Sequence, residues 1–361
     1  MPVNKQTIDT VRIEQLKSLK DIELDFKDKS VTAIFGVNGC GKSTILHTLA
    51  CLYRPQSNIG ERNYFTRFFK RENRVTWAGS KLQVDFTING AAVHRKYEKN
   101  GDRWTPRIDK RPQRDVVYVG INSCVPDIEQ ATITVSKYNM GVEEAVVCKD
   151  DIIRSASKIM NYAYEDYVKA TCRKRKFKKV ARNGQLRYSS LSMGAGEQRL
   201  FALLETLYSM PPYSLLLIDE LDLTLHKSAL AKLVDEMVKV ANKRHLQIVF
   251  TTHREELAFR RDINIRHIWN AADGSQSFVL NHTTPDCVHR LTGQIEKQLE
   301  IYVEDELAEY ISREVVRSKG LLPYTSFHQY GAIENAFVVA AGLDIQEANS
   351  EQYFVKNLTI I

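Results

Sequence analysis

The residues best suited to chemistry lie at positions 36–44, where glycines stand beside a lysine and two hydroxyl groups. The stretch reads Gly-Val-Asn-Gly-Cys-Gly-Lys-Ser-Thr and matches the pattern G-x-x-x-x-G-K-[ST]. Glycines let backbone N–H groups approach phosphate oxygens, since no side chain blocks them. Lys42 can reach the outer phosphates of a nucleotide, and Ser43 can hold Mg²⁺. The stretch therefore predicts a phosphate-binding loop.

The neighbours of this loop support the same interpretation. An apolar run at Val31–Phe35 precedes it, and a helical pattern at Ile45–Leu52 follows it. Strand, glycine loop and helix in this order are the context that the pattern requires. The N-terminus of the helix would favour the same anion. A chance glycine-rich turn would not come with both neighbours, so we set that alternative aside.

Two later strand ends carry ionisable residues. Asp219 and Glu220 follow the apolar run Leu215–Ile218, and His253 follows the run 246–252. In α/β proteins, ligand chemistry gathers at the carboxyl ends of strands. Asp219 would then lie in the second shell of Mg²⁺, and Glu220 would polarise the attacking water as a general base. Taken singly, a solvated acidic turn and a structural histidine explain the same residues.

A second glycine-rich stretch, Leu191–Gln198, begins a helix that continues through Tyr208. Gly194 and Gly196 would expose backbone donors at the positive end of that helix. Taken alone, an ordinary helix start capped by Ser192 explains the stretch equally well.

Composition limits the class of protein. With 361 residues the chain exceeds a single hydrophobic core, so we expect two or more modules. Charged residues make up 26% and hydrophobic residues 43%, as in soluble proteins, and no run approaches the ~18 apolar residues of a membrane span. The six cysteines are scattered without a C-x-x-C pair, which favours reduced thiols in the cytoplasm. The net charge of +7 permits nucleic-acid binding without demonstrating it.

The remaining segments give a mixed pattern of elements. Alternating residues and turn signals predict strands at Val11–Leu16, Ile22–Phe26, Leu82–Ile88, Ala92–Tyr97 and Val116–Val119. Residues 56–80 are not assigned, and the pattern over 128–179 favours helix. A basic run at 173–179 ends that segment, and it suits either a nucleic-acid backbone or a solvated surface, the second being the more common case.

Five motifs in this order resemble the ABC-type ATPases, in the branch that contains the SMC, RecF and OLD (overcoming lysogenisation defect) proteins. The resemblance covers about residues 10–290. It makes residues 36–44 the Walker A motif, 191–198 the signature with Ala195-Gly196 inserted, 215–220 Walker B, 222–226 the D-loop and His253 the switch histidine. The glutamine of the Q-loop is not identified near Tyr118–Asn122.

The resemblance implies an ATP sandwich between two subunits. ATP and Mg²⁺ would be held by one copy, with Ser43 and Asp219 on the metal side, Glu220 as the base and His253 at the γ-phosphate. The residues implied to bind the nucleotide are Asn38, Gly39, Gly41, Lys42, Ser43 and Thr44. Ser192, Gly194 and Gly196 would cap it from a second copy, so the chain is expected to form a homodimer at least.

The tail resembles the opening of a Toprim domain. The strand Leu299–Glu306 ends in acids, a helix at Leu307–Ser318 follows, and segments at 328–342 and 355–361 suit further β/α units. Glu304 would bind Mg²⁺ or Mn²⁺ or act in acid–base chemistry, with Asp305 or Glu309 as a helper. The usual glycine after Glu304 is absent. A D-x-D pair is expected after residue 361, which favours a truncated domain over a degenerate one or a small α/β appendage used for dimer contacts.

We therefore expect an α/β protein with an ABC-type ATPase domain at 1–293, an inserted α/β-to-helical segment at about 56–190 that serves dimerisation or regulation, and the start of a Toprim-like domain at 294–361. The resemblance implies an ATPase that regulates a Toprim DNA nuclease in anti-phage defence, acting on DNA with a defence partner protein or nucleic acid and without a membrane. The alternative is a RecF- or SMC-like DNA clamp that recruits a separate effector. A transporter subunit is disfavoured by Asn38 and by the G-E-Q form of the signature.

Overall fold

The computed structural model forms two compact units, residues 1–282 and 283–361, where the sequence suggested a boundary at 293/294. The residues that the structure describes are 5–70, 77–101, 103–130, 144–147, 150–172, 175–182, 186–271, 276–284, 287–288, 291, 299–319, 321–322, 325–332, 334–339, 341 and 359–360. No helix among them has both the length and the apolarity that crossing a membrane requires.

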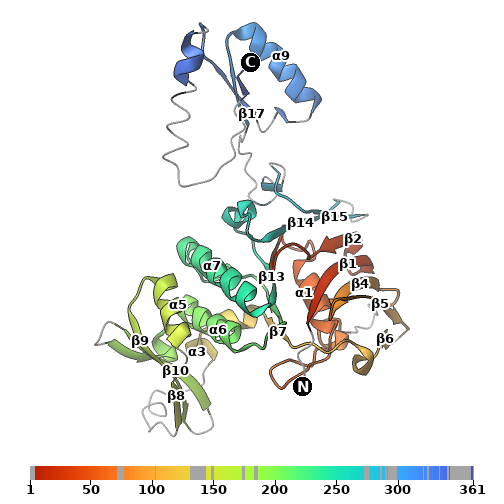
Figure 1. Ribbon diagram of the computed structural model, residues 1–361, viewed down its shortest axis with the longest axis vertical. Helices are drawn as coiled ribbons and strands as arrows, with labels where there is room; N and C mark the ends of the chain where they lie inside the picture. The colour runs from red at the N-terminus through yellow and green to blue at the C-terminus, as the bar shows by residue number, and fades with distance from the viewer. Residues whose placement is uncertain are drawn as a thin grey trace. The chain divides into compact units, whose positions relative to one another are not determined.

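A six-stranded sheet forms the centre of the first unit (Figure 1). Its strands, in spatial order, are β15 (Ser277–Leu280), β14 (Asn264–Asn270), β3 (Val31–Phe35), β13 (Gln247–Thr251), β12 (Leu215–Ile218) and β7 (Val116–Val119). All neighbours pair in parallel except β15, which is antiparallel to β14. Every residue of β3, β12 and β13 is buried, as expected for parallel strands covered on both faces.

A five-stranded antiparallel sheet lies beside it, in the order β2 (Leu19–Asp25), β1 (Gln6–Leu16), β4 (Lys81–Ile88), β5 (Ala91–Asn100) and β6 (Arg103–Thr105). The strand β1 begins earlier than the sequence pattern indicated. Asn89 and Gly90 have φ of 52° and 83° between β4 and β5, which confirms the predicted hairpin turn.

The helix α1 (Lys42–Cys51) packs between the two sheets, beside β1 and β4 in Figure 1. Its apolar side chains join one hydrophobic core with Val11 of β1, Val84 of β4, and Leu217 of β12. The short helix α2 (Phe65–Phe68) closes this core with aromatic rings, and Phe65 stacks on Trp104 with ring centroids 4.0 Å apart. This packing fixes the phosphate-binding loop at the start of α1.

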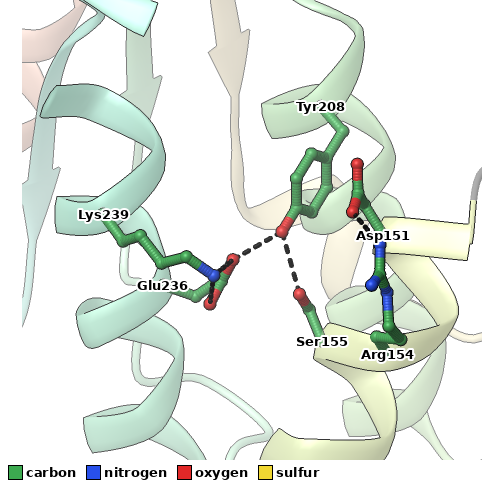
Figure 2. Close-up of polar contacts among 6 residues, drawn as sticks. All are labelled: Asp151, Arg154, Ser155, Tyr208, Glu236 and Lys239. Atoms are coloured by element: carbon green, nitrogen blue, oxygen red, sulfur yellow. Dashed lines mark hydrogen bonds and ion pairs between the residues drawn. The ribbon is translucent and has the colours of Figure 1, made fainter. Parts of the chain in front are cut away.

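Three helices gather on the other side of β13 in Figure 1: α5 (Asp150–Met160), α6 (Ala195–Ser209) and α7 (Lys227–Arg244). Figure 2 shows how Tyr208 of α6 joins the other two helices. Its hydroxyl donates to Glu236 Oε1 of α7 at 2.5 Å and lies 2.9 Å from Ser155 Oγ of α5. Lys239 pairs with Glu236 at 3.3 Å, so the carboxylate has partners on two sides.

The insertion contains a four-stranded antiparallel sheet in the order β11 (Leu186–Ser189), β10 (Arg175–Arg182), β9 (Tyr164–Cys172) and β8 (Glu144–Val147). The helical prediction over 128–179 is therefore wrong for the residues that lie in β8, β9 and β10, and it is confirmed for α5 and for the end of the short helix α3 (Asp127–Gln130), while 131–143, 148–149 and 173–174 lie outside the described residues. Aromatic and β-branched residues favour strand there, and pairing between distant segments outweighs the loose helical period. Of the basic run, residues 175–179 lie in β10, while 173 and 174 lie outside the described residues. The remaining short 3₁₀ helices are η1 (Ile108–Lys110), η2 (Ile121–Cys124), η3 (Ser190–Ser192) and η4 (Glu255–Phe259).

The second unit is a small parallel sheet in the order β17 (Thr325–Gln329), β16 (Leu299–Val303) and β18 (Thr359–Ile360), with the helix α9 (Glu306–Ser318) between β16 and β17 in the chain. Ile301, Val303 and Val316 form its small core. The predicted first strand and helix are present. Of the predicted third strand, 355–358 and 361 lie outside the described residues.

Candidate functional site

The glycines of the phosphate-binding loop are required by its backbone. Gly36, Gly39 and Gly41 have φ of 155°, 82° and 107°, values that L side chains rarely adopt. A Cβ on Gly36 would lie 2.3 Å from the carbonyl oxygen of Ile268, and one on Gly41 would lie 2.5 Å from the Leu19 side chain. Around Gly39 the space is open. The loop therefore presents bare backbone at the N-terminus of α1, where an anion is favoured.

The ammonium group of Lys42 lies inside the loop. Its Nζ donates to the carbonyl oxygens of Gly36 at 2.7 Å and Val37 at 3.1 Å. Burial lowers the pKa of Lys42, and the negative charges of Glu220, Asp219 and Asp222 oppose that shift. The hydroxyl of the next residue, Ser43, donates to Asp219, which follows β12. The carbonyl oxygen of Thr44 accepts from Thr48 Oγ1 at 2.7 Å, within α1.

Asp219 joins the loop to two strands of the central sheet. Its Oδ1 accepts from Ser43 Oγ at 3.1 Å and from Thr251 Oγ1 at 2.8 Å. Its Oδ2 accepts from the Tyr118 hydroxyl at 3.3 Å. Asp219 is 3% exposed, so these donors and any bound cation replace the water that its carboxylate would otherwise bind.

Glu220 follows directly and has a left-handed backbone, with φ of 49°. Its N–H donates to Thr251 Oγ1 at 2.7 Å, which holds the turn against β13. Such a conformation costs about 1–2 kcal/mol for a residue with a side chain, and strain of this kind gathers at functional sites. The turn separates the half-buried Glu220 side chain from the buried side chain of its neighbour.

His253 lies after β13, half-buried beside the same group of charges. Burial lowers its pKa first, the Lys42 charge lowers it further, and the carboxylates Asp222, Glu220 and Asp219 partly offset both. The imidazole is therefore neutral near pH 7 and can donate one hydrogen bond and accept another.

The signature stretch meets the D-loop. A Cβ on Gly196 would lie 2.3 Å from the carbonyl oxygen of Thr224, so only glycine permits this contact. Ser192 and Gly194 are exposed. The helix α6 is capped by the backbone of Gly194 without a side-chain hydrogen bond, so Ser192 is not its cap.

The structure adds functional candidates that the sequence reading missed. Arg199 is fully buried, and its guanidinium donates to the carbonyl oxygens of Asp219 at 3.0 Å, Glu220 at 2.6 Å and Leu223 at 2.9 Å. Thr251 and Tyr118 hold Asp219 as described above. A charged residue on the buried face of a helix and a threonine inside an apolar strand were the available signals. The Q-loop residue stays unassigned, because β7 ends at Val119 and leads into η2.

His47 is a further missed residue, on α1 behind the loop. Its Nε2 lies 2.9 Å from the Tyr118 hydroxyl. Burial lowers the pKa of His47 to about 4, so this ring is neutral near pH 7. Nothing in the sequence distinguished it from an ordinary polar position on a helix.

The predicted metal-binding residue of the tail, Glu304, is exposed after β16, where its carbonyl oxygen accepts from Gly331 N at 3.0 Å. Asp305 caps α9 by accepting from Ala308 N at 2.8 Å, and Glu309 bonds to Arg313 and Gln329. Among the described residues, no three His, Cys, Asp or Glu side chains form a group that could hold a metal ion. A metal site in the tail stays a prediction.

The family model that matches this chain falls within the first unit. The family described as "AAA domain, putative AbiEii toxin, Type IV TA system" matches residues 177–258. The chain is similar to the cobalt import ATP-binding protein CbiO of Salmonella paratyphi A, with 29% identity over 36% of this chain and 36% of that protein. The aliphatic sulfonates import ATP-binding protein SsuB 1 of Mesorhizobium japonicum is 38% identical over 21% of this chain and 31% of its own length.

The match thus spans about a third of the length of these relatives. Among solved structures, the SMC head domain from Thermotoga maritima has a TM-score of 0.47 and 17% identity, covering 77% of this chain and 99% of that one. Together with the strand–loop–helix at 31–51, the sequence matches place the chain in a class: it contains a P-loop ATPase domain of the ABC type.

Proposed function

We propose that this protein binds ATP with Mg²⁺ at the 36–44 loop and hydrolyses it. The observation that carries the proposal is the direct hydrogen bond from Ser43 of the loop to Asp219, at 3.1 Å. It brings the phosphate-binding loop to the strand end that also bears Glu220. His253 lies close enough to both carboxylates and to Lys42 for their charges to shift the pKa of its imidazole.

The residues present suit both groups. Bare backbone at Gly39 and the Lys42 ammonium suit the negative charge of a triphosphate chain, with Asn38, Gly41 and Thr44 in the same loop. The hydroxyl of Ser43 and the carboxylate of Asp219 are oxygen donors of the kind that Mg²⁺ prefers. Bound there, Mg²⁺ would supply charge neutralisation at the outer phosphates.

The chain's own groups then divide the work. Glu220 accepts the proton of the attacking water, Lys42 leaves the carbonyl oxygens of the loop to bind phosphate, and neutral His253 donates to the γ-phosphate. Arg199 holds the Walker B turn and D-loop in register. A second copy of the chain would supply Ser192, Gly194 and Gly196, and the exposure of Ser192 and Gly194 at the start of α6 leaves this end of the helix open to a partner. The working unit would therefore be a homodimer.

Glu220→Gln tests the proposal. Loss of the general base should slow ATP turnover by about 100-fold or more, while a fluorescent ATP analogue still binds. With Mg²⁺ and ATP the variant should also accumulate as a dimer in light scattering, because closure is no longer followed by hydrolysis. Glu23→Gln, an exposed carboxylate on β2, is the matched control. Turnover unchanged in Glu220→Gln would remove Glu220 as the base.

For the whole protein, we infer an OLD-type ATPase whose nucleotide state gates a Toprim DNA nuclease in defence against phage. A parallel β16–α9–β17 unit with Glu304 at the end of its first strand supports the nuclease part. A clamp of the RecF or SMC kind that recruits a separate effector is the alternative, and the presence of a D-x-D pair after the strand predicted at 355–361 distinguishes the two. DNA, and a defence partner protein or nucleic acid, would then shift the nucleotide state.

A further inference from the structure

We propose that Tyr118, oriented by His47, positions the Asp219 carboxylate for magnesium. The inference rests on the proposed function, because it concerns how Mg²⁺ is held with ATP. Neither residue belongs to a motif in the sequence. Tyr118 lies in β7, and His47 lies in α1, the helix that follows the phosphate-binding loop.

The two oxygens of Asp219 are held from different directions. Ser43 and Thr251 both donate to Oδ1, at 3.1 and 2.8 Å. Tyr118 donates to Oδ2 at 3.3 Å. A carboxylate bound through one oxygen can still rotate about its Cβ–Cγ bond. Contact with the second oxygen fixes its plane and so the direction of its remaining lone pairs.

Counting protons determines the role of His47. An ionised carboxylate only accepts, so the single proton of the Tyr118 hydroxyl points to Asp219. The Tyr118 oxygen must then accept at its other contact, 2.9 Å from His47 Nε2. A neutral imidazole carries one N–H, which is therefore on Nε2. The other nitrogen, Nδ1, is buried without a hydrogen-bond partner in the described part of the chain, as an unprotonated nitrogen in this tautomer would be.

Aromatic packing locks both rings. His47 stacks on Phe68 of α2, with centroids 4.3 Å apart and planes at 12°. Tyr118 meets His47 and Phe68 edge-on, at 5.2 and 5.4 Å. The Arg67 guanidinium covers Phe68 at 5.1 Å. The Tyr118 ring is thus held by His47 of α1 and Phe68 of α2, and neither residue lies in a nucleotide-binding motif.

The consequence lies in metal affinity. Outer-shell partners of this kind typically contribute 10- to 100-fold to metal binding. Removing the Tyr118 hydroxyl should weaken the binding of Mg²⁺. The contacts that Lys42 and the loop make with the phosphates should stay intact. Tyr118 and His47 are positioning residues, since they act through Asp219.

The test compares binding of a fluorescent ATP analogue, mant-ATP, in EDTA and in Mg²⁺. Tyr118→Phe should bind it as wild type does in EDTA, and its tightening by Mg²⁺ should be about 10-fold smaller. His47→Gln retains a side-chain N–H donor and should keep most of the tightening, whereas His47→Leu should lose it. Tyr97→Phe is the matched control, because it also removes one buried tyrosine hydroxyl. That hydroxyl donates to Leu52 O at 2.8 Å and not to Asp219, so this variant should behave as wild type.

A full Mg²⁺ effect in Tyr118→Phe would overturn the inference, and so would equal losses in EDTA and in Mg²⁺, which would mean general damage to the site. Identical behaviour of His47→Gln and His47→Leu would remove His47 from the role. Wild-type protein that fails to bind mant-ATP would instead overturn the proposed function, and the two failures are therefore distinguishable.

Discussion

Thr251 shows how much one side chain contributes to this site. Its hydroxyl donates to Asp219 Oδ1 at 2.8 Å and accepts from the Glu220 N–H at 2.7 Å. One rigid β-branched residue on β13 thereby fixes both the metal-side carboxylate and the backbone that carries the proposed base. Since it is fully buried, water cannot replace it.

His267 makes a prediction about pH. It is 2% exposed on β14 and stacks on Phe35 at 5.0 Å, and burial lowers its pKa to about 4. Between that value and the ordinary 6.5, the unfolded chain binds a proton that the folded chain does not. Stability therefore falls as pH drops from 6.5 toward 4, and the cost at pH 5 is about 2 kcal/mol from this residue. Below pH 4 it adds no further loss.

Urea unfolding at pH 7 and pH 5, followed by tryptophan fluorescence, measures this effect. All three tryptophans, at 77, 104 and 269, lie in the first unit, so the signal reports that unit. His267→Phe should show a smaller loss between the two pH values than wild type. An equal loss in both proteins would contradict the prediction.

At the scale of elements, α6 is held by carboxylate–tyrosine bonds along its length. Tyr164 donates to Glu197 at 2.6 Å and Tyr167 donates to Glu205 at 2.6 Å, both from β9 of the insertion. Tyr167 also stacks on Phe201 at 4.2 Å. The insertion is thus fastened to the helix that begins with the signature residues.

A third tyrosine–carboxylate bond, from Tyr208 of α6 to Glu236 of α7, gives a prediction about stability (Figure 2). Burial raises its pKa to about 12, so the hydroxyl stays protonated and donates to Glu236. Tyr208→Phe should lower the free energy of unfolding by about 1–2 kcal/mol, since a buried carboxylate loses a donor while Lys239 remains. Tyr64→Phe, at an exposed ring, should change stability by less than about 0.5 kcal/mol. A Tyr208 variant as stable as this control would show that the bond contributes little.

At the scale of the whole molecule, the question is whether two units share one function. If the tail is a nuclease controlled by ATP, Glu304→Ala in the full-length protein should reduce metal-dependent nicking of supercoiled DNA to background and leave ATP turnover unchanged. The exposed neighbour Glu306→Ala serves as the control. Persistent nicking in Glu304→Ala would rule out the Toprim interpretation, and unchanged ATP turnover separates that result from damage to the first unit.

Local sequence patterns were enough to predict the phosphate loop, the order of the motifs, the central strands β3, β7, β12 and β13, and the β4–β5 hairpin, whereas β14 and β15 were not predicted. Each predicted feature depends on local chemistry: glycine where φ is positive, apolar runs where a strand is buried on both faces, and an Asn-Gly turn. The tertiary structure decided the insertion, where pairing between β8, β9, β10 and β11 outweighed a weak helical period. It also decided the surroundings of Asp219. Tyr118, His47, Thr251 and Arg199 lie on four separate elements, and hydrogen bonds between residues so far apart in the chain leave no spacing for a sequence pattern to detect.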